Sequence, residues 1–165
     1  MITRADEWDR LFMNFATDVA NMSRAIRLKV GAVAVHDRRV IAIGYNGTPG
    51  GEDNCCEELV ESFENGNEPD YDGSARREWK DGKNWVYKTK SNVIHAEDNL
   101  LRFCESNNIN TNGCTLYITH SPCPLCGSKI IDAGFKEVVY EKHYRIVTDL
   151  GNLSDAGIKV RQWNP

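Results

Sequence analysis

The sequence lacks the features that mark secreted, membrane and polynucleotide-binding proteins. Its 165 residues contain no run of 18 apolar residues, so we expect no membrane-spanning helix and no membrane partner. The first ten residues lack the basic start and apolar stretch of a secretory signal, which predicts a cytoplasmic protein. The net charge is -4, whereas a protein that binds a polynucleotide usually presents a basic face. We therefore expect no polynucleotide as the main partner.

Cysteine is also scarce for a disulfide-stabilised scaffold, with six residues in the whole chain. In a reducing compartment, the C-x-x-C spacing of Cys123 and Cys126 more often indicates a metal site or a redox site. Hydrophobic residues make up 41% of the chain, which is enough for the core of one compact α/β domain. We expect a single domain over residues 1–165.

Charge is unevenly distributed within this domain. Residues 52–72 carry nine acidic residues and no Lys or Arg, and residues 75–90 carry six Lys or Arg against two acidic residues. Tryptophans among the basic residues are compatible with nucleic-acid binding, but the acidic half would repel phosphates. We favour a charged excursion over about 52–90 whose halves pair with each other or with a neighbouring subunit.

The hydrophobic pattern predicts a hairpin followed by alternating strands and helices. An amphipathic helix is expected over 4–22 and a hairpin over 30–36 and 40–46. Further elements are a helix over 94–107, a strand over 115–120, a helix over 124–134, a strand over 137–140, a helix over 148–156 and a strand over 158–163. This order indicates a mixed sheet covered by helices on both faces.

Three metal-binding residue types fall at the predicted starts of two helices. Cys123 and Cys126 lie beside the free N–H groups at the start of the helix predicted over 124–134. The positive dipole end there favours the thiolate form that binds metal. His95 lies at the start of the helix predicted over 94–107. Two thiolates and one imidazole are three zinc ligands, and a catalytic zinc site keeps its fourth position for water. The pattern therefore predicts one catalytic Zn²⁺ per chain.

Glu97 follows His95 by two residues and is the predicted proton carrier. At the first turn of a helix, both side chains can converge on a point beyond the helix end. A zinc ion with two thiolate ligands acidifies water weakly, so an added base is useful.

Each part of this pattern has another interpretation when taken alone. A C-x-x-C pair can be a redox site, or half of a structural zinc site closed by Cys55, Cys56, Cys104 or Cys114. A lone histidine is more often structural. The combination of H-A-E with P-C-x-x-C is a strong signal, because both halves fall at predicted helix starts. It also resembles the signature of zinc nucleobase deaminases.

The chain resembles the cytidine deaminase superfamily, and within it the deoxycytidylate (dCMP) deaminase branch. The resemblance covers nearly the whole chain and rests on residues 23–33, 44–56, 95–101, 117–126 and 138–144. H-A-E with P-C-x-x-C belongs to the whole superfamily, whereas the segment G-Y-N-G-x-P-x-G is much more specific to the dCMP branch. The resemblance implies a three-layer α/β/α sandwich with a central mixed five-stranded sheet.

The resemblance also implies an activity. Water activated by zinc attacks C4 of the cytosine of dCMP, Glu97 carries a proton to N3, and ammonia leaves to give dUMP for thymidylate synthesis. Family members are commonly homohexamers, activated by dCTP and inhibited by dTTP. Some relatives carry a second zinc, but Ala25 and Val93 stand where two of its ligands are expected, so we expect a single zinc.

Further substrate-binding residues are carried over from the family. Asn46 has an amide able to bind a sugar hydroxyl and the pyrimidine, although it could equally adopt a left-handed turn before Gly47. Tyr144 matches the substrate tyrosine, against an ordinary half-buried tyrosine. Ala96 and Ser121 lie next to the predicted zinc ligands and are expected in the substrate site.

The phosphate of a nucleotide needs donors as well. Ser23, Arg24 and Arg27 precede the first strand and are candidates for this role, although solvated arginines at a helix end are an equal alternative.

A glycine-rich loop is the candidate effector site, because glycines let backbone N–H groups approach a phosphate. Its predicted effector-binding residues are Gly47, Thr48, Gly50, Gly51 and Asn54. Acidic residues in the same loop would repel a nucleoside triphosphate unless Mg²⁺ accompanied it.

Two rival functions stay open at this point. Another cytosine or purine nucleoside, a free base or a tRNA adenosine could be the substrate. The fold could also serve as a non-catalytic, effector-binding module, although such a module has no need of Glu97.

Overall fold

A computed structural model describes residues 3–62, 77–144 and 150–164 of the chain. Its main sheet has five strands in the order β2-β1-β6-β7-β8. The strands are β1 (Gly31–His36), β2 (Arg39–Tyr45), β6 (Thr115–His120), β7 (Glu137–Lys142) and β8 (Lys159–Gln162). β1 pairs antiparallel with β2 and β6, while β6, β7 and β8 run parallel, so the sheet is mixed as predicted.

One helix covers one face of this sheet. Helix α1 (Arg4–Ala20) starts at a capping box between Thr3 and Asp6 and packs along β1 and β6. Val33 and Val35 of β1 point toward it, as the two-residue period of a strand requires. Gly31 lets the helix approach closely, because a Cβ there would collide with the helix backbone.

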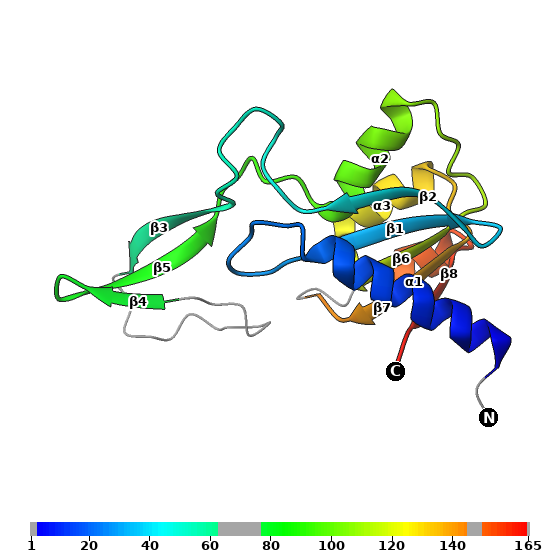
Figure 1. Ribbon diagram of the computed structural model, residues 1–165, viewed down its shortest axis with the longest axis horizontal. Coiled ribbons are helices and arrows are strands. Elements are labelled where there is room, and N and C mark those ends of the chain that lie inside the picture. Colours follow the sequence, from blue (N-terminus) through cyan, green and yellow to red (C-terminus); the bar gives the residue numbers. More distant parts are fainter. Residues whose placement is uncertain (1–2, 63–76, 145–149, 165) are drawn as a thin grey trace.

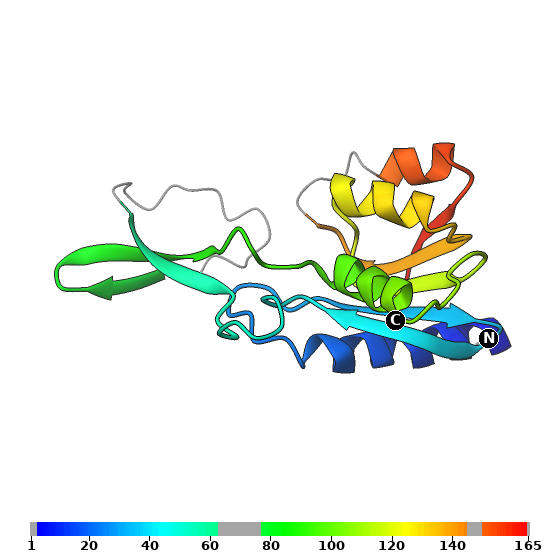
Figure 2. The ribbon, with the colours of Figure 1, turned by 90° about the horizontal axis from the view of Figure 1, so that it is seen from above.

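Three helices cover the other face (Figure 2). They are α2 (Ala96–Ser106), α3 (Pro124–Asp132) and α4 (Leu150–Asp155). The alternate β1 residues, Ala32 and Ala34, enter the core on this side. Gly44 of β2 has the same role as Gly31, since a Cβ there would meet the α2 backbone at Leu100. These layers confirm the predicted α/β/α sandwich.

Most helix and strand boundaries differ from the predicted ones by one or two residues. Helix α1 ends at Ala20 instead of Met22, and α2 begins at Ala96 instead of Ile94. The first two residues of the helix predicted over 148–156 lie outside the described residues, as does the central part (63–76) of the charged excursion.

The described parts of the excursion form a second sheet, which projects from the main body as an arm (Figure 1). Its strands β3 (Glu57–Ser62), β4 (Arg77–Lys80) and β5 (Lys83–Thr89) lie in the order β3-β5-β4, all antiparallel. The acidic and basic halves face each other here, with an ion pair of 2.9 Å between Lys83 and Glu61. The sequence did not predict these strands, because their charges obscure the alternating pattern.

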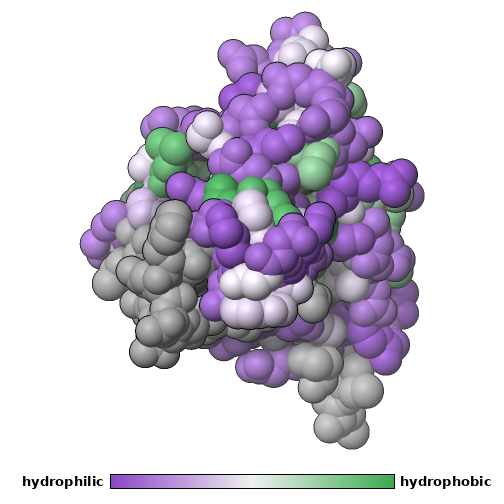
Figure 3. All heavy atoms as spheres, turned by 90° about the vertical axis from the view of Figure 1, so that its left-hand side faces the viewer, coloured by the Kyte–Doolittle hydropathy of each residue, from purple (hydrophilic) through white to green (hydrophobic). Residues whose placement is uncertain are grey.

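The end of the molecule that carries the arm is largely hydrophilic, with small hydrophobic groups between the polar ones (Figure 3). Among the helices of the described chain, none is long and apolar enough to cross a membrane.

Candidate active site

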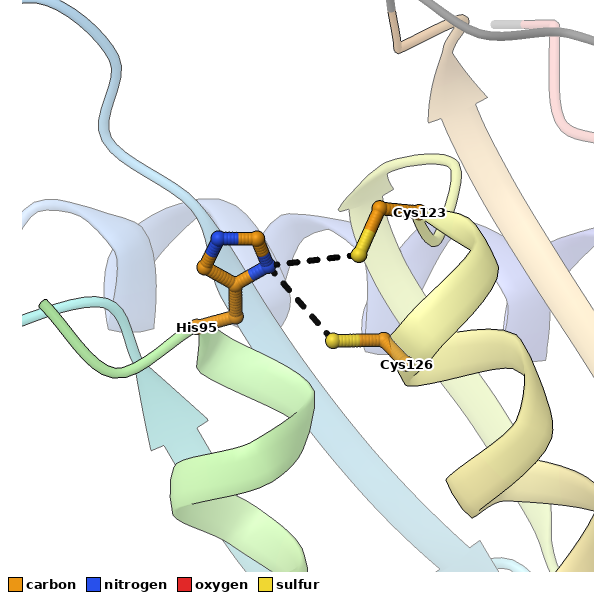
Figure 4. A group of neighbouring side chains, drawn as sticks. All are labelled: His95, Cys123 and Cys126. Carbon is orange, nitrogen blue, oxygen red and sulfur yellow. Dashed lines mark hydrogen bonds between the residues drawn. The ribbon is translucent and has the colours of Figure 1, made fainter. Parts of the chain in front are cut away.

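His95, Cys123 and Cys126 meet where two helices begin (Figure 4). His95 is the N-cap residue of α2, Cys123 is the N-cap residue of α3, and Pro124 occupies the first turn of α3, as expected from its fixed φ. The His95 Nδ1 atom lies 3.5 Å from the Sγ atom of each cysteine. The sequence predicted this convergence correctly.

The spacing of these three atoms fits a tetrahedral zinc ion. Zinc bonds of about 2.3 Å to sulfur and about 2.0–2.1 Å to nitrogen place the two ligand atoms about 3.5 Å apart. The observed Nδ1–Sγ distances are 3.5 Å, and all three donor atoms lie within 4.8 Å of one another. These residues could therefore hold a metal ion without rearrangement.

The other four cysteines do not join this group. In the described part of the chain, His95, Cys123 and Cys126 are the residues that come close enough together to share a metal ion. Cys55 is exposed beside the arm, and Cys104 and Cys114 are buried in the core. A zinc ion held by these three residues would keep a fourth position for water or substrate, as catalytic zinc sites do.

The thiols of the C-x-x-C pair have pKa values shifted in opposite directions. Hydrogen bonds from Cys126, and then from His95, lower the pKa of Cys123 to about 4. The hydrogen bond to Cys123, together with burial, raises the pKa of Cys126. A bound cation would favour the thiolate form of both sulfurs.

Glu97 lies in the first turn of α2 and is only 4% exposed. Burial raises the pKa of its carboxyl to about 7, although its backbone N–H and the charge on His95 act in the opposite direction. A carboxyl with such a pKa can both accept and release a proton near neutral pH. It lines the same cavity as His95 and Cys123.

This cavity also contains most of the predicted substrate residues. Those that line it are Arg27, Asn46, Ala96, Ser121 and Tyr144. Leu28, Val30, Val93 and His120 add to the walls, and so do Glu57 and Thr89 from the arm. Sequence reasoning missed Glu57 and Thr89, because only the pairing of β3 with β5 brings them to the cavity.

Ser23 and Arg24 are not among the residues that line the cavity. Ser23 is buried, and its hydroxyl donates to the Asn46 carbonyl at 2.7 Å and accepts from Ala25 N–H. The Arg24 side chain is exposed. Of the two arginines proposed for phosphate binding, the structure therefore places Arg27 at the cavity and Arg24 outside it.

Asn46 supports the cavity wall with its side-chain amide. Its Oδ1 accepts from Val30 N–H at 2.8 Å, and its Nδ2 donates to the Leu28 carbonyl at 2.9 Å. One amide hydrogen and one oxygen lone pair remain for a substrate. The alternative of a left-handed conformation at Asn46 is wrong, because the backbone φ angle of Asn46 is not positive.

Tyr144 and Ser121 join the two strand ends that border the cavity. The Tyr144 N–H donates to the Ser121 hydroxyl at 2.8 Å, and the Ser121 N–H donates to the Lys142 carbonyl at 2.8 Å. Segments after β6 and β7 are thereby held side by side, as expected at the carboxyl ends of parallel strands.

The glycine-rich loop is tied to the start of α2. Gly47 and Ile94 exchange two backbone hydrogen bonds, of 3.1 and 2.8 Å, directly before His95. Thr48 donates to the Asp53 carbonyl at 2.6 Å, and Asp53 forms an ion pair of 3.0 Å with Lys90. The predicted effector residues Gly50, Gly51 and Asn54 are exposed.

Comparison with known proteins identifies the family. A family model described as "Cytidine and deoxycytidylate deaminase zinc-binding region" matches residues 6–142. The chain belongs to this family. The match includes both helix starts that carry His95, Cys123 and Cys126.

Similar members of the family are deoxycytidylate deaminases from several sources. The protein from Saccharomyces cerevisiae is 36% identical over 158 residues, covering 95% of this chain and 45% of its own length. The protein from Mycobacterium phage D29 is 37% identical over 138 residues, covering 82% of this chain and 95% of its own. The chain thus spans less than half of the yeast protein and nearly all of the phage protein.

A solved structure of the family also matches. The crystal structure of dCMP deaminase from the cyanophage S-TIM5, in complex with dCMP and dUMP, superposes with a TM-score of 0.76 at 31% identity. The match covers 95% of this chain and 97% of the cyanophage chain.

Proposed function

We propose that this protein hydrolyses dCMP to dUMP and ammonia. The observation that carries the proposal is one cavity that joins a His/Cys/Cys metal-binding group and a buried glutamate with Arg27. The metal-binding group and the glutamate suit deamination of a base, and Arg27 suits a substrate that carries a phosphate. Relatives named deoxycytidylate deaminases, one of them solved with dCMP and dUMP, support it.

His95, Cys123 and Cys126 would hold the zinc ion. Zinc in such a site lowers the pKa of water and so supplies a nucleophile near neutral pH. Glu97 accepts the proton of this water and delivers it to N3 of the cytosine. As the water oxygen bonds to C4, its remaining proton passes through Glu97 to the amino nitrogen, so that the C4–N bond breaks, ammonia leaves and C4 becomes a carbonyl.

Arg27 and Asn46 would hold the other end of the substrate. The Arg27 guanidinium pairs with the 5′-phosphate, and the unused hydrogen of the Asn46 amide meets a sugar hydroxyl. Tyr144 lines the same cavity. A hydrogen bond to a charged group contributes about 1.5–3 kcal/mol, so two such bonds from the Arg27 guanidinium to the phosphate would favour dCMP over deoxycytidine by orders of magnitude.

Release of ammonia from dCMP, deoxycytidine, CMP and guanine tests this proposal. We expect kcat/KM for dCMP to exceed that for deoxycytidine at least a hundredfold. Arg27→Met should reduce this ratio at least tenfold, while Arg24→Met, its control outside the cavity, should leave it within twofold. Equal kcat/KM for dCMP and deoxycytidine would instead favour a nucleoside deaminase.

Regulation by dCTP as activator and dTTP as inhibitor is part of the proposal. Its support is the glycine-rich loop, whose hydrogen bonds to Ile94 connect it to His95. Mg²⁺ would accompany the triphosphate, because Glu52 and Asp53 lie in that loop. Sigmoidal dCMP saturation that becomes hyperbolic with dCTP and Mg²⁺ is expected, and curves unaffected by dCTP and dTTP would contradict it.

A homohexamer is the proposed assembly, by similarity to the family, and sedimentation or light scattering measures it directly. The proposed compartment is the cytoplasm, of a cell or of an infected host cell.

A further inference from the structure

Glu57 is a buried glutamate at the first position of β3, with 3% of its surface exposed. Its two carboxylate oxygens accept hydrogen bonds from two consecutive backbone groups. Oε2 accepts from Ile26 N–H at 2.9 Å, and Oε1 accepts from Arg27 N–H at 3.2 Å. One side chain thus fixes the backbone of the segment that leads into β1.

Glu57 connects this segment to the arm. It pairs with Thr89 at the end of β5 where the arm joins the main body, and both residues line the cavity. The preceding residue, Cys56, is buried and accepts a hydrogen bond of 2.9 Å from Lys90 N–H. The position of Glu57 is therefore set by the paired strands of the arm.

Arg27 is the residue that this contact holds. Its side chain lines the cavity, and its Nε atom is buried without a hydrogen-bond partner in the part of the chain that the structure describes. The charge of the Arg27 guanidinium suits an anionic ligand such as a phosphate in this cavity. Lysine is absent from the cavity lining, and Arg27 is its one arginine, among the described residues.

We infer that Glu57 is a positioning residue that holds Arg27 for the substrate phosphate, so that the arm contributes to the preference for a nucleotide over a nucleoside. The inference rests on the proposed function. Glu57 acts through the backbone N–H groups of residues 26 and 27.

The variant Glu57→Gln distinguishes the positioning of Arg27 from a direct effect of the Glu57 charge on the substrate phosphate. The variant removes a negative charge from the cavity, so a purely electrostatic effect would lower KM for dCMP. A glutamine also presents an NH₂ donor where one of the two backbone N–H groups needs an acceptor, which releases the Arg27 segment. We expect KM for dCMP to rise at least tenfold and kcat to fall less than threefold. For deoxycytidine, which has no phosphate, kcat/KM should change less than threefold.

Glu58→Gln is the matched control. It removes the same charge from the next residue of β3, which is exposed and points to the opposite side of the arm sheet. We expect its KM for dCMP to stay within twofold of the original. Combining Glu57→Gln with Arg27→Met should give the KM of Arg27→Met alone, because Glu57 acts through Arg27.

Three outcomes would overturn the inference. The first is a KM for dCMP that is unchanged or lower in Glu57→Gln, which leaves the proposed function intact. The second is an equal loss with dCMP and deoxycytidine, which indicates a general structural role. The third is that the protein without substitutions does not deaminate dCMP, which would contradict the proposed function as well. If Glu57→Gln does not fold, Glu57→Asp, which keeps the charge but shortens the reach, should show the same rise in KM.

Discussion

At the scale of single residues, the site combines groups whose proton affinities differ because their surroundings differ. Glu97 is buried, and burial raises its pKa to about 7. Cys123, hydrogen-bonded to Cys126 and His95, has a pKa lowered to about 4. The first value suits a proton carrier and the second suits a metal ligand, whereas Cys126, whose pKa is raised, would need a bound cation to favour its thiolate.

Glu97→Gln should abolish turnover while keeping the metal. The amide is nearly isosteric but cannot carry a proton, so we expect kcat to fall about 10²–10⁴-fold. Zinc content, measured by atomic absorption, should stay at one ion per chain because Glu97 is not a proposed ligand. Near-normal turnover in this variant would remove Glu97 from the mechanism.

Cys126→Ala should lose the metal and stability together. With one of three ligands gone, a zinc ion at about 1,000 times its Kd would no longer add about 4 kcal/mol to the free energy of unfolding. Thermal melts with and without zinc should then coincide for the variant and differ for the original protein. Retention of one zinc per chain would point to another cysteine as ligand.

At the scale of elements, the two helices that carry the site are joined by an ion pair. Asp98 lies three residues after His95 in α2, and Lys129 lies three residues after Cys126 in α3. Their Oδ1 and Nζ atoms are 2.6 Å apart, and the Asp98 side chain is only 16% exposed. The contact fixes the spacing of the helix starts, and so the spacing of the three metal-binding residues.

Lys129→Met should weaken zinc binding without removing a ligand. Because the helix starts lose their fixed distance, we expect the Kd for zinc to rise about tenfold, the size of effect typical of groups that orient ligands. Arg102→Met is the control, since Arg102 pairs with the same Asp98 at 3.0 Å but within α2. Competition with a chelator measures both, and equal effects would mean that the charge of Asp98, and not the helix spacing, matters.

At the scale of the whole molecule, a buried ion cluster joins the first helix to the last strand. Arg161 of β8 donates to both carboxylate oxygens of Asp9 in α1, at 2.6 and 2.7 Å, and Tyr117 of β6 donates to the same carboxylate at 2.8 Å. The Arg161 Nε atom donates to Glu137 of β7 at 2.8 Å. The cluster thus connects three strands and the helix that covers them.

Arg161→Met should destabilise the whole fold. Removing the guanidinium leaves the Asp9 carboxylate buried and uncompensated, so we expect the free energy of unfolding in urea to fall by about 3 kcal/mol. Lys159→Met is the control, because Lys159 pairs with Glu137 from an exposed position and should cost less than about 1 kcal/mol. Similar losses in both variants would contradict a special role for the cluster.

The same cluster gives the stability a dependence on pH. Burial alone would raise the pKa of Glu137, but hydrogen bonds from Arg161 and Lys159 outweigh it and leave the pKa below its ordinary value. A lowered carboxyl pKa stabilises the fold above the unfolded pKa and loses that stabilisation as the pH falls through the folded one. The free energy of unfolding should therefore drop below about pH 4, and less steeply in Arg161→Met.

The grouping of His95 with Cys123 and Cys126 was predictable from the sequence, because local rules govern the starts of the two helices. A histidine and two cysteines at helix starts, with Pro124 in the first turn, define positions that neighbouring residues alone determine. The strands of the main sheet were predictable for a similar reason, since runs such as 30–36 and 115–120 are β-branched and bounded by turns.

The rest was decided only by tertiary structure, because it depends on residues distant in the chain. Arg24 and Arg27 look alike in the sequence, and only the fold places Arg27 at the cavity. Glu57 reads as one acid among nine until β3 pairs with β5 and carries it to the backbone of Arg27, 30 residues away in sequence. Strand pairing and buried hydrogen bonds between separate segments lower the free energy of the whole fold. The residue pattern of a single segment cannot predict these interactions, because it does not say which other segment will lie beside it.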